Sequence, residues 1–574
     1  MNLVIDGQRQ VVYYPATFAT DVLMNEPAPV TSTYTCPDGT PFEVRWPEPG
    51  METFGWRWDQ MHCPLPFTPL SDEWGRHVGA GFASAMDATG VPGQPVQLCI
   101  NGYRFSRQSQ FPGDPEVRAA WFNYDLIQRI DRVLELWNST YCPEVEALTT
   151  SVLAWEGDLS TPLPQLMHRI DQLHAARRRH GELHTLVMGV ATVAGNRFLD
   201  WCKANLGAEG EQAGDEMTRG FRNKSLETSE QLWSLSRQVL AAPAVADLLR
   251  TVIPSAFLLN LRQVEGGNQF AEAFAAFLEE FGHRSEAFIE LSNKTWFEDP
   301  RFPLFLLKRY LDAPANQDPT VMHEASVAAR QKRVAEVEAS LTQEQLAIFR
   351  QYLVSAQQRT VLLEDHNFYI DQKALVAART PGLAIARRLV GQGAIDAIED
   401  IWYLQEAEMH AAAANIALRL QQPVAERKRE RERWMRVLPP TAIGSAAPVS
   451  NPALDRFYGS FEQEPEEAGV VKGIAGSRGI CRGVARLILS LDDIDRLEPG
   501  DILVTYATAP TWTPLFAIAG GIVTDAGGPL SHCAVVAREY GIPAVVGCRT
   551  ATARIADGAL ITVDGDSGRV RIEG

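Results

Sequence analysis

The chain has 574 residues, of which 45% are hydrophobic and 22% are charged, and its formal net charge is −18. A chain of this length is too long for one hydrophobic core and predicts two to four domains. The excess of acidic residues argues against nonspecific binding to nucleic acid or to anionic membranes, because both need a basic surface. We therefore expect no nucleic-acid or membrane partner, and look instead to proteins and small molecules.

Cysteines and the amino terminus narrow the class further. The eight cysteines are scattered and form no C-x-x-C pair, so neither a zinc site nor a disulfide framework is indicated. The amino terminus lacks a basic region followed by an apolar core, and no stretch is long and apolar enough to span a bilayer. We expect a cytoplasmic protein.

The composition divides the chain into segments. Residues 1–110 are rich in Pro, Gly, Thr and aromatics, with short alternating runs such as FEVRW at 42–46, which predict irregular β structure and loops. Residues 111–438 carry long stretches with helical apolar spacing, for example 269–280, and predict a large helical domain. The mixed-charge run at 426–433 is typical of a solvated helix face.

A helix-breaking segment follows at residues 439–468. It begins with PPTAIGSAAPVSNP and continues into the acidic FEQEPEE, which is typical of a linker. About thirty residues of flexible coil would span roughly 30 Å, enough for a domain to swing. A rigid, packed connector is the alternative.

The last segment, residues 469–574, contains a histidine at the start of a predicted helix. A β-branched run at 522–525 is followed by a Gly-Gly-Pro breaker and then by the helical pattern 531–540. Ser531 is a plausible N-cap, so His532 falls in the first turn, where free N–H groups and the helix dipole favour an anion. Neutral imidazole can attack phosphorus and later leave. A helix-capping histidine without chemistry is the alternative.

The stretch GGPLSHCAVVAREYGIPAVVG at 527–547 resembles the phosphohistidine motif of the swivelling domain in phosphoenolpyruvate-utilising enzymes. The resemblance continues through GIAGSRG at 473–479, GVARL at 483–487, DILVT at 501–505, PTWTPL at 510–515 and VDG at 563–565. It implies a compact β/β/α domain in which His532 carries phosphate between two distant sites. Gly527, Gly528 and Ser531 would support that phosphate, and Cys533 is expected to serve packing.

A second polar cluster follows a helix that Gly282 is positioned to end, in FGHRSEAFIELSNKTWFEDP at 281–300. Arg284 offers a planar fork for phosphoryl oxygens, and His283 could orient or deprotonate an acceptor hydroxyl. The alternative is a turn tied by a pair between Arg284 and Glu286 or Glu290. The segment resembles the substrate-binding domain of rifampin phosphotransferase and its relatives, which implies that Glu290 and Trp296 contact substrate.

Shorter matches to the same domain are PFTPL at 66–70, RRLVGQG at 387–393 and EDIWYL at 399–404.

A third cluster is LEDHNFYID at 363–371, on a probable helix. Glu364 and His366 do not share a helix face well, whereas Asp365 and Tyr369 do, so only some of these groups can converge on one pocket. One of them could accept a hydroxyl proton; buried polar groups that crosslink helices are the alternative. The cluster resembles that of the phosphohistidine subunits of aryl phosphate synthases, which phosphorylate phenol or cresol.

Together these features predict a multidomain α+β protein with a mainly helical substrate domain, an irregular β-containing amino-terminal part and a β/β/α swivelling domain. A phosphoenolpyruvate-binding barrel would need about 250 residues, and the predicted segments leave no room for one, so we expect none here. No nucleotide-binding region is recognised either. We expect a separate ATP-grasp subunit, with ATP and Mg²⁺, to phosphorylate His532.

By the resemblance, His532 and the catalytic residues Arg284, His283 and His366 would pass the phosphoryl group to a small aromatic alcohol or phenol, with AMP and phosphate as products. A rifamycin-type antibiotic acceptor is one alternative, and a non-catalytic phosphocarrier or regulatory module is another. No metal site is identified in the chain itself.

Overall fold

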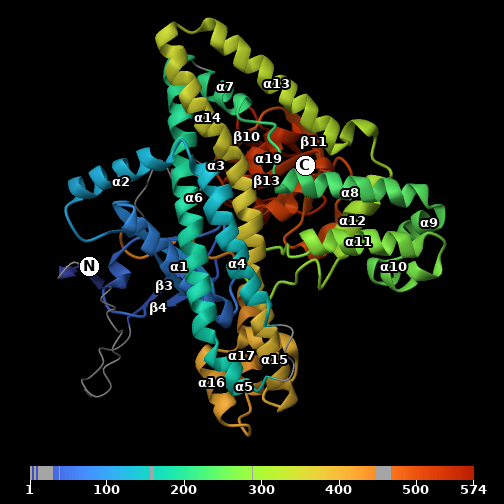
Figure 1. The fold of residues 1–574 in the computed structure, drawn as a ribbon. Coiled ribbons are helices and arrows are strands. Elements are labelled where there is room, and N and C mark those ends of the chain that lie inside the picture. The colour runs from blue at the N-terminus through green and yellow to red at the C-terminus, as the bar shows by residue number, and fades with distance from the viewer. Residues whose placement is uncertain are drawn as a thin grey trace.

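The computed structural model describes residues 3–5, 8–10, 30–37, 39–155, 161–207, 209–287, 289–447, 467–529 and 531–573. It is multidomain and α+β, with a helical centre and a carboxyl-terminal sheet domain (Figure 1), as the sequence predicts. None of the described helices is both long enough and apolar enough to cross a membrane.

Two small sheets form the amino-terminal part. In the first, β3 (Thr31–Thr35) pairs with β4 (Pro41–Arg45). The second has the order β6-β7-β5-β8. In chain order its strands are β5 (Trp56–Trp58), β6 (Gly93–Ile100), β7 (Tyr103–Gln110) and β8 (Ala442–Ile443). A short pair, β1 (Leu3–Ile5) with β2 (Gln8–Gln10), precedes them.

Two expectations for this part need correction. A twenty-residue helix, α1 (Pro69–Ala88), lies within the segment that we expected to be β structure and loops. Its buried residues include Leu70, Trp74, Val78, Gly81 and Ala85, which recur every three to four positions and so cover one helix face. This helical spacing is present in the sequence, but the Pro, Gly and aromatic residues around it led us to predict loops and strands instead.

The second correction concerns the predicted linker. Strand β8 (Ala442–Ile443) pairs with β5, and Ser445 N–H donates to Glu52 O at 2.8 Å. The first residues of the segment 439–468 therefore belong to the amino-terminal sheet. Residues 448–466, on which the flexible-coil prediction mainly rests, lie outside the described residues.

The helical centre is built around two long helices, α6 (Ile170–Asn205) and α14 (Gln343–His366), which pack along each other, and α1 packs along α6 (Figure 1). Gly181 and Gly81 allow the close contact of α1 with α6, since a Cβ on Gly181 would lie 2.3 Å from Val78 O. A π-helix, η5 (Asn367–Leu375), continues directly from α14.

The other helices of the centre surround this pair, with the following bounds: α2 (Pro115–Arg129), α3 (Val133–Leu136), α4 (Cys142–Leu153), α5 (Leu163–His168), α7 (Gly210–Met217), α8 (Lys224–Ala241), α9 (Pro243–Thr251), α10 (Pro254–Asn260), α11 (Gly267–Phe281), α12 (Arg301–Leu311), α13 (Pro319–Ser340), α15 (Arg379–Gly391), α16 (Glu406–Ala414) and α17 (Gln421–Trp434).

The carboxyl-terminal domain is a mixed eight-stranded sheet with the order β10-β14-β13-β12-β11-β15-β16-β9. Its central strands β11 (Ile480–Leu487), β12 (Ile502–Thr505), β13 (Gly521–Thr524) and β14 (Ala544–Val546) are parallel neighbours. The outer strands are β9 (Val470–Lys472), β10 (Ile474–Ser477), β15 (Leu560–Asp564) and β16 (Arg569–Ile572).

Two helices, α19 (His532–Tyr540) and α20 (Ala551–Arg554), and the 3₁₀ segments η8 (Leu491–Arg496) and η9 (Pro510–Ala517) complete this domain. Buried side chains of η9 and α19 join one hydrophobic cluster with α8, α11 and α12. The carboxyl-terminal domain therefore packs on the helical centre, with α8, α13 and α14 around it (Figure 1).

Candidate active site

His532 is the first residue of α19 and follows the turn after β13. Gly527 has φ 112° in this turn, and a Cβ there would lie 2.8 Å from Ser531 Oγ, so only glycine fits without a shift. Ser531 is the N-cap and accepts from the Ala534 N–H. This confirms the cap and the placement of His532 in the first helical turn, where the helix dipole favours an anion.

Both ring nitrogens of His532 meet threonine hydroxyls. Nδ1 lies 3.0 Å from Thr508 Oγ1, and Nε2 lies 3.1 Å from Thr513 Oγ1. Phe516 packs against the ring edge-on, with centroids 6.0 Å apart. Burial, and then the charge of Arg284, lower the pKa of His532 to about 3, so the imidazole is neutral at neutral pH and keeps a lone pair.

Arg284 comes from the loop that follows α11. Gly282 is the C-cap of that helix, as predicted, and a Cβ on it would lie 2.3 Å from Leu278 O. The guanidinium is buried, and its Nη2 donates to Thr228 Oγ1 at 2.8 Å. Burial lowers the pKa of Arg284 to about 10, which leaves it charged at neutral pH. It supplies a positive charge close to His532.

Hydrogen bonds around Arg284 join the two domains. Thr511 Oγ1 of η9 donates to Ser285 O at 2.8 Å, and Ser285 N–H donates to Gln372 Oε1 at 3.0 Å. The neighbouring Glu286 accepts from Ser490 Oγ at 3.0 Å and from the Leu491 N–H at 3.0 Å. The histidine domain is thus docked on the Arg284 loop, in part through Glu286.

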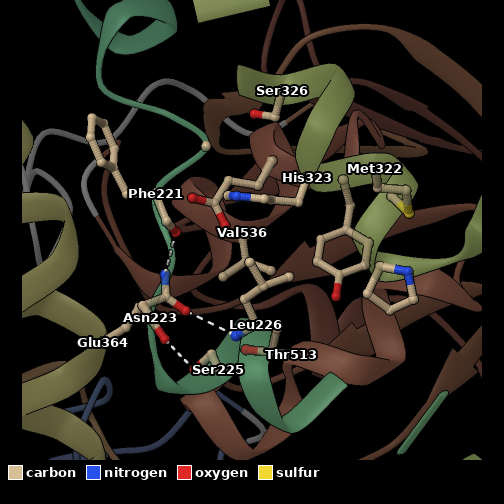
Figure 2. Close-up of a pocket in the computed structure, with 14 residues that line it drawn as sticks. Phe221, Asn223, Ser225, Leu226, Met322, His323, Ser326, Glu364, Thr513 and Val536 are labelled. Atoms are coloured by element: carbon tan, nitrogen blue, oxygen red, sulfur yellow. Dashed lines mark hydrogen bonds between the residues drawn. The ribbon is translucent and has the colours of Figure 1, made fainter. Parts of the chain in front are cut away.

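A cleft opens between α19 and the helical domain (Figure 2). Its empty space, with the open mouth included, is about 560 Å³. Thr513 lines it, so Nε2 of His532 is the nitrogen linked to the cleft wall. The apolar part of the wall consists of Phe221, Leu226, Pro319, Met322, Val536 and Tyr540.

Two carboxyl groups from different domains face this cleft. Glu364 at the end of α14 accepts a short hydrogen bond from Ser225 Oγ, and burial raises its pKa. Glu539 of α19 has its pKa raised to about 7 by burial and by the nearby charge of Glu364. Each is held closer to its neutral form than an exposed glutamate would be.

The other predicted residues of the Arg284 segment lie in different surroundings. The ring of His283 packs edge-on against Phe297 with centroids 5.2 Å apart, and burial lowers its pKa to about 4. No contact between His283 and His532 is found in the described part of the chain. Trp296 is buried in an aromatic stack with Phe277 and Phe302 and therefore belongs to the core under Arg284.

Glu290 differs most from its predicted role. Its Oε2 accepts from the Thr68 N–H at 2.8 Å, and its Oε1 accepts from Thr68 Oγ1 and Ser71 Oγ, both at 2.9 Å, and from the Ser292 N–H at 2.8 Å. The carboxylate is thus saturated and ties its loop to the start of α1. We correct its assignment from substrate contact to a structural crosslink.

The LEDHNFYID cluster is split between two sides of the helix, as the spacing argument predicts. Asp365 accepts from the Lys224 N–H at 3.0 Å, and burial raises its pKa to about 6, so Asp365 and Glu364 both hold the start of α8. Tyr369 packs on Phe368 and Trp137. His366 points elsewhere: its Nε2 lies 3.6 Å from Asp371 Oδ2, and no contact with His532 is found in the residues that the structure describes.

Sequence reasoning missed Thr508, Thr513 and Glu539. Thr513 lies in the PTWTPL segment at 510–515, and Glu539 lies in the motif at 527–547. Both segments resemble the phosphohistidine domain, so the sequence could have indicated both residues. Nothing local marks Thr508, which reaches His532 only because η9 folds back over α19. Cys533 is buried, and its pKa is raised to about 12 by burial, so it is an unreactive thiol at neutral pH, in line with a packing role.

Two protein families match parts of the chain. Residues 184–362 match the rifampicin phosphotransferase fourth domain, and residues 497–568 match the mobile domain of PEP-utilising enzymes. The second match contains His532 and its threonines, and the first contains Arg284 and its surroundings. The chain therefore joins a phosphohistidine domain of the PEP-utilising type to a rifampicin-phosphotransferase-like region.

Two of the following three relatives are phosphotransferases by name. The chain is 33% identical over 557 residues to chondramide synthase cmdD of Chondromyces crocatus, which covers 92% of the chain and 14% of that protein. It is 34% identical over 359 residues to the uncharacterized phosphotransferase YvkC of Bacillus subtilis (62% of the chain, 43% of that protein). It is 32% identical over 344 residues to the rifampicin phosphotransferase of the same organism (58% and 38%). The chain spans less than half the length of each of these relatives.

Proposed function

We propose that this chain is the phosphohistidine-bearing component of an ATP-dependent phosphotransferase. His532 receives a phosphoryl group derived from ATP and passes it to a hydroxyl group of a small molecule bound in the cleft beside α19. The observation that carries the proposal is the docking of His532 beside the buried Arg284, with Nε2 on the cleft side. The matches to a mobile domain and to a phosphotransferase domain support the same chemistry.

The phosphoryl group is carried on Nε2 in this proposal. Thr508 Oγ1 accepts a hydrogen bond from Nδ1–H, which leaves the Nε2 lone pair for phosphorus, and Thr513 lines the space into which a phosphoryl group would extend. Arg284 balances the negative charge on the phosphoryl oxygens during transfer. Its partly unpaired guanidinium supports this role, because Nε has no hydrogen-bond partner among the described residues.

In the transfer step, the acceptor oxygen attacks phosphorus and forms the new O–P bond while the Nε2–P bond breaks. The bonding electrons return to Nε2, and the hydroxyl proton passes to a carboxylate of the cleft. Glu539 suits this step because a pKa of about 7 leaves a substantial ionised fraction at neutral pH while keeping it a useful base. Glu364 lies close enough to raise the pKa of Glu539 and is the second candidate base.

The proposed acceptor is a small aromatic alcohol or phenol, such as phenol or cresol. The mixture of Phe221, Leu226, Met322, Val536 and Tyr540 with two carboxyl groups suits a molecule that has an apolar body and one hydroxyl. The loader in this proposal is a separate ATP-grasp subunit that holds ATP and Mg²⁺ and yields AMP and phosphate. Because ATP is held on the other subunit in this proposal, the domain that carries His532 must move away from the Arg284 loop to be loaded. The match to a mobile domain supports such a movement.

The test separates loading from transfer. The purified chain is incubated with ATP, Mg²⁺ and an ATP-grasp partner, or with phosphoramidate as a chemical phosphoryl donor, and its intact mass is measured before and after phenols are added. We expect one acid-labile phosphoryl group that is lost to the phenol and is absent from His532→Ala. Full transfer activity in His532→Ala would refute the proposal, and a stable phosphohistidine that no small molecule discharges would favour a phosphocarrier.

A rifamycin-type antibiotic is a second candidate acceptor. It is favoured by the match of residues 184–362 to the rifampicin phosphotransferase fourth domain. Rifamycin and phenol added in parallel to the phosphorylated chain distinguish the two, because only the true acceptor accelerates loss of the phosphoryl group from His532.

A further inference from the structure

Away from the cleft, two histidines and an aspartate converge between α6 and the end of α14. His184 Nδ1 lies 3.2 Å from Asp371 Oδ1, and His366 Nε2 lies 3.6 Å from Asp371 Oδ2. One ligand atom from each of the three residues lies within 4.8 Å of the other two. In the described part of the chain, this is the one group of His, Cys, Asp and Glu side chains with such a separation.

The π-helix explains why the sequence conceals this cluster. His366 and Asp371 are five residues apart, and in an α-helix that spacing turns two side chains about 140° from each other. The wider turn of η5, whose hydrogen bonds join residues five apart, returns Asp371 to the face of His366. Single π turns inside helices are frequent at functional sites.

The hydrogen bonds around the cluster orient its atoms as ligands. His366 Nδ1 donates to Leu362 O at 2.6 Å, which places the Nε2 lone pair toward Asp371. Histidines that bind metals are held in this way by a bond from the other ring nitrogen.

Asn367 adds a second observation. Its Nδ2 donates to Asp371 Oδ2 at 3.1 Å and so orients the carboxylate, while its Oδ1 is buried and has no hydrogen-bond partner among the described residues. An unpaired buried carbonyl oxygen on a residue that bonds Asp371 is costly unless a cation or a donor is nearby.

We propose that His184, His366 and Asp371 form a binding site for a divalent first-row metal ion such as Zn²⁺. Ligand atoms about 2.1 Å from one such ion lie about 3.0–3.4 Å from each other. Here the imidazole nitrogens of His184 and His366 lie 3.2 and 3.6 Å from separate oxygens of the Asp371 carboxylate, and one atom of each residue lies within 4.8 Å of the other two. Two imidazoles and one carboxylate are a donor set that these ions favour. The His184 side chain is 25% exposed, which gives the ion a route in and leaves a position for water.

The ion would stabilise the backbone that carries part of the candidate active site. Glu364, at the cleft, comes two residues before His366, and Gln372, which accepts from the Ser285 N–H beside Arg284, comes one residue after Asp371. A metal that joins α6 to η5 would hold both residues in place. Its role in this proposal is therefore structural support of the docking surface, separate from the chemistry at His532.

The experiment measures metal content directly and does not depend on transfer activity. The full chain is stripped with a chelator, dialysed against a small excess of Zn²⁺ and analysed by mass spectrometry of its metals, and Co²⁺ is used in parallel as a spectroscopic probe. We expect one equivalent more Zn²⁺ in the wild type than in His184→Gln or Asp371→Asn, and a visible Co²⁺ spectrum that both variants lose.

His180→Gln is the matched control, because His180 is a buried histidine one turn earlier on α6 and outside the cluster. It should keep the full equivalent of metal. Circular dichroism confirms that His184→Gln, the least buried of the three positions, remains folded. Equal Zn²⁺ content in the wild type and in folded His184→Gln and Asp371→Asn, or no bound metal in the wild type, would overturn the proposal and leave a hydrogen-bonded His-Asp-His cluster.

Discussion

Replacement of Glu539 by glutamine should remove a pH dependence from the docking of the histidine domain. Glu539 lies in the cleft near Glu364 of the helical domain and near Arg219 and Arg538, and its pKa is raised to about 7 by burial and by Glu364. In an undocked domain the carboxyl would return toward its ordinary pKa of 4.5. The docked state therefore holds a proton that the undocked state releases.

The direction and the size of this pH dependence follow from the difference between the docked and undocked pKa values of Glu539. The contribution of Glu539 to docking is largest below pH 4.5, falls as pH rises toward the docked pKa of about 7, and then levels off. The full difference of about 2.5 pH units is worth about 3.4 kcal/mol as an upper limit. Between about pH 5.5 and 7.5 the contribution of Glu539 to the free energy of docking changes by about 2 kcal/mol, which is roughly twentyfold in the docking equilibrium.

His532 titrates in the opposite sense. Its docked pKa of about 3 lies below its ordinary value of 6.5, so loss of its proton strengthens docking as pH rises. Because His532 is present in both the wild type and Glu539→Gln, the difference between the two proteins isolates the contribution of Glu539.

Hydrogen exchange of the peptides that cover 508–516 and 532–540 measures docking. At pH 7.5, relative to pH 5.5 and after correction for intrinsic rates, Glu539→Gln should keep its protection better than the wild type by up to about twentyfold. Glu573→Gln, a carboxyl in the sheet domain that bonds Arg482 and Thr562, is the control and should behave as the wild type. The same pH response in the wild type and in Glu539→Gln would refute the reasoning.

Three further substitutions test the docked site and its support. Arg284→Lys keeps a charge but loses the planar fork, and should slow single-turnover transfer from phosphorylated His532 about 10²–10³-fold while loading is unchanged. Thr511→Val removes the donor to Ser285 O, and should weaken docking by about 1–3 kcal/mol, seen as faster exchange of 508–516. Glu290→Ala breaks the bonds to Thr68 and its neighbours, and should destabilise the helical domain by about 3 kcal/mol, seen as a lower Tm by calorimetry.

Each of these results has a contrary outcome. Loss of loading as well as transfer in Arg284→Lys would mean that the arginine acts before the transfer step. Unchanged exchange in Thr511→Val would mean that the hydrogen bond to Ser285 does not contribute to docking. An unaltered Tm in Glu290→Ala would contradict its role as a crosslink and return it to the candidate substrate contacts.

Local features of the site could be predicted from the sequence because they depend on neighbours in the chain. The Gly-Gly-Pro turn and the Ser531 cap place His532 at a helix start, and Gly282 ends α11 before Arg284. Each depends on backbone geometry within a few residues. The same logic failed for α1, because its helical spacing lay within a segment whose composition favours loops.

Contacts between distant segments could not be read in this way. Thr68 bonds Glu290 across 222 positions in the chain, and His184 bonds Asp371 across 187 positions. Spacing arguments showed that Glu364 and His366 must face different sides, but not which partner each side would meet. Single residues carry little information about such pairings, since the packing of whole helices decides them.

The sequence by itself determined that a histidine begins a helix after a glycine-rich turn, that an arginine follows a helix end some 250 residues earlier, and that helices fill the space between. Only the tertiary structure decided that Arg284 and His532 share one site, that Glu364 and Glu539 close a cleft beside it, and that Glu290 belongs to the scaffold. The reason is physical: caps and turns are stabilised by bonds within a few residues, whereas burial and charge at the site arise from the docking of one domain on another.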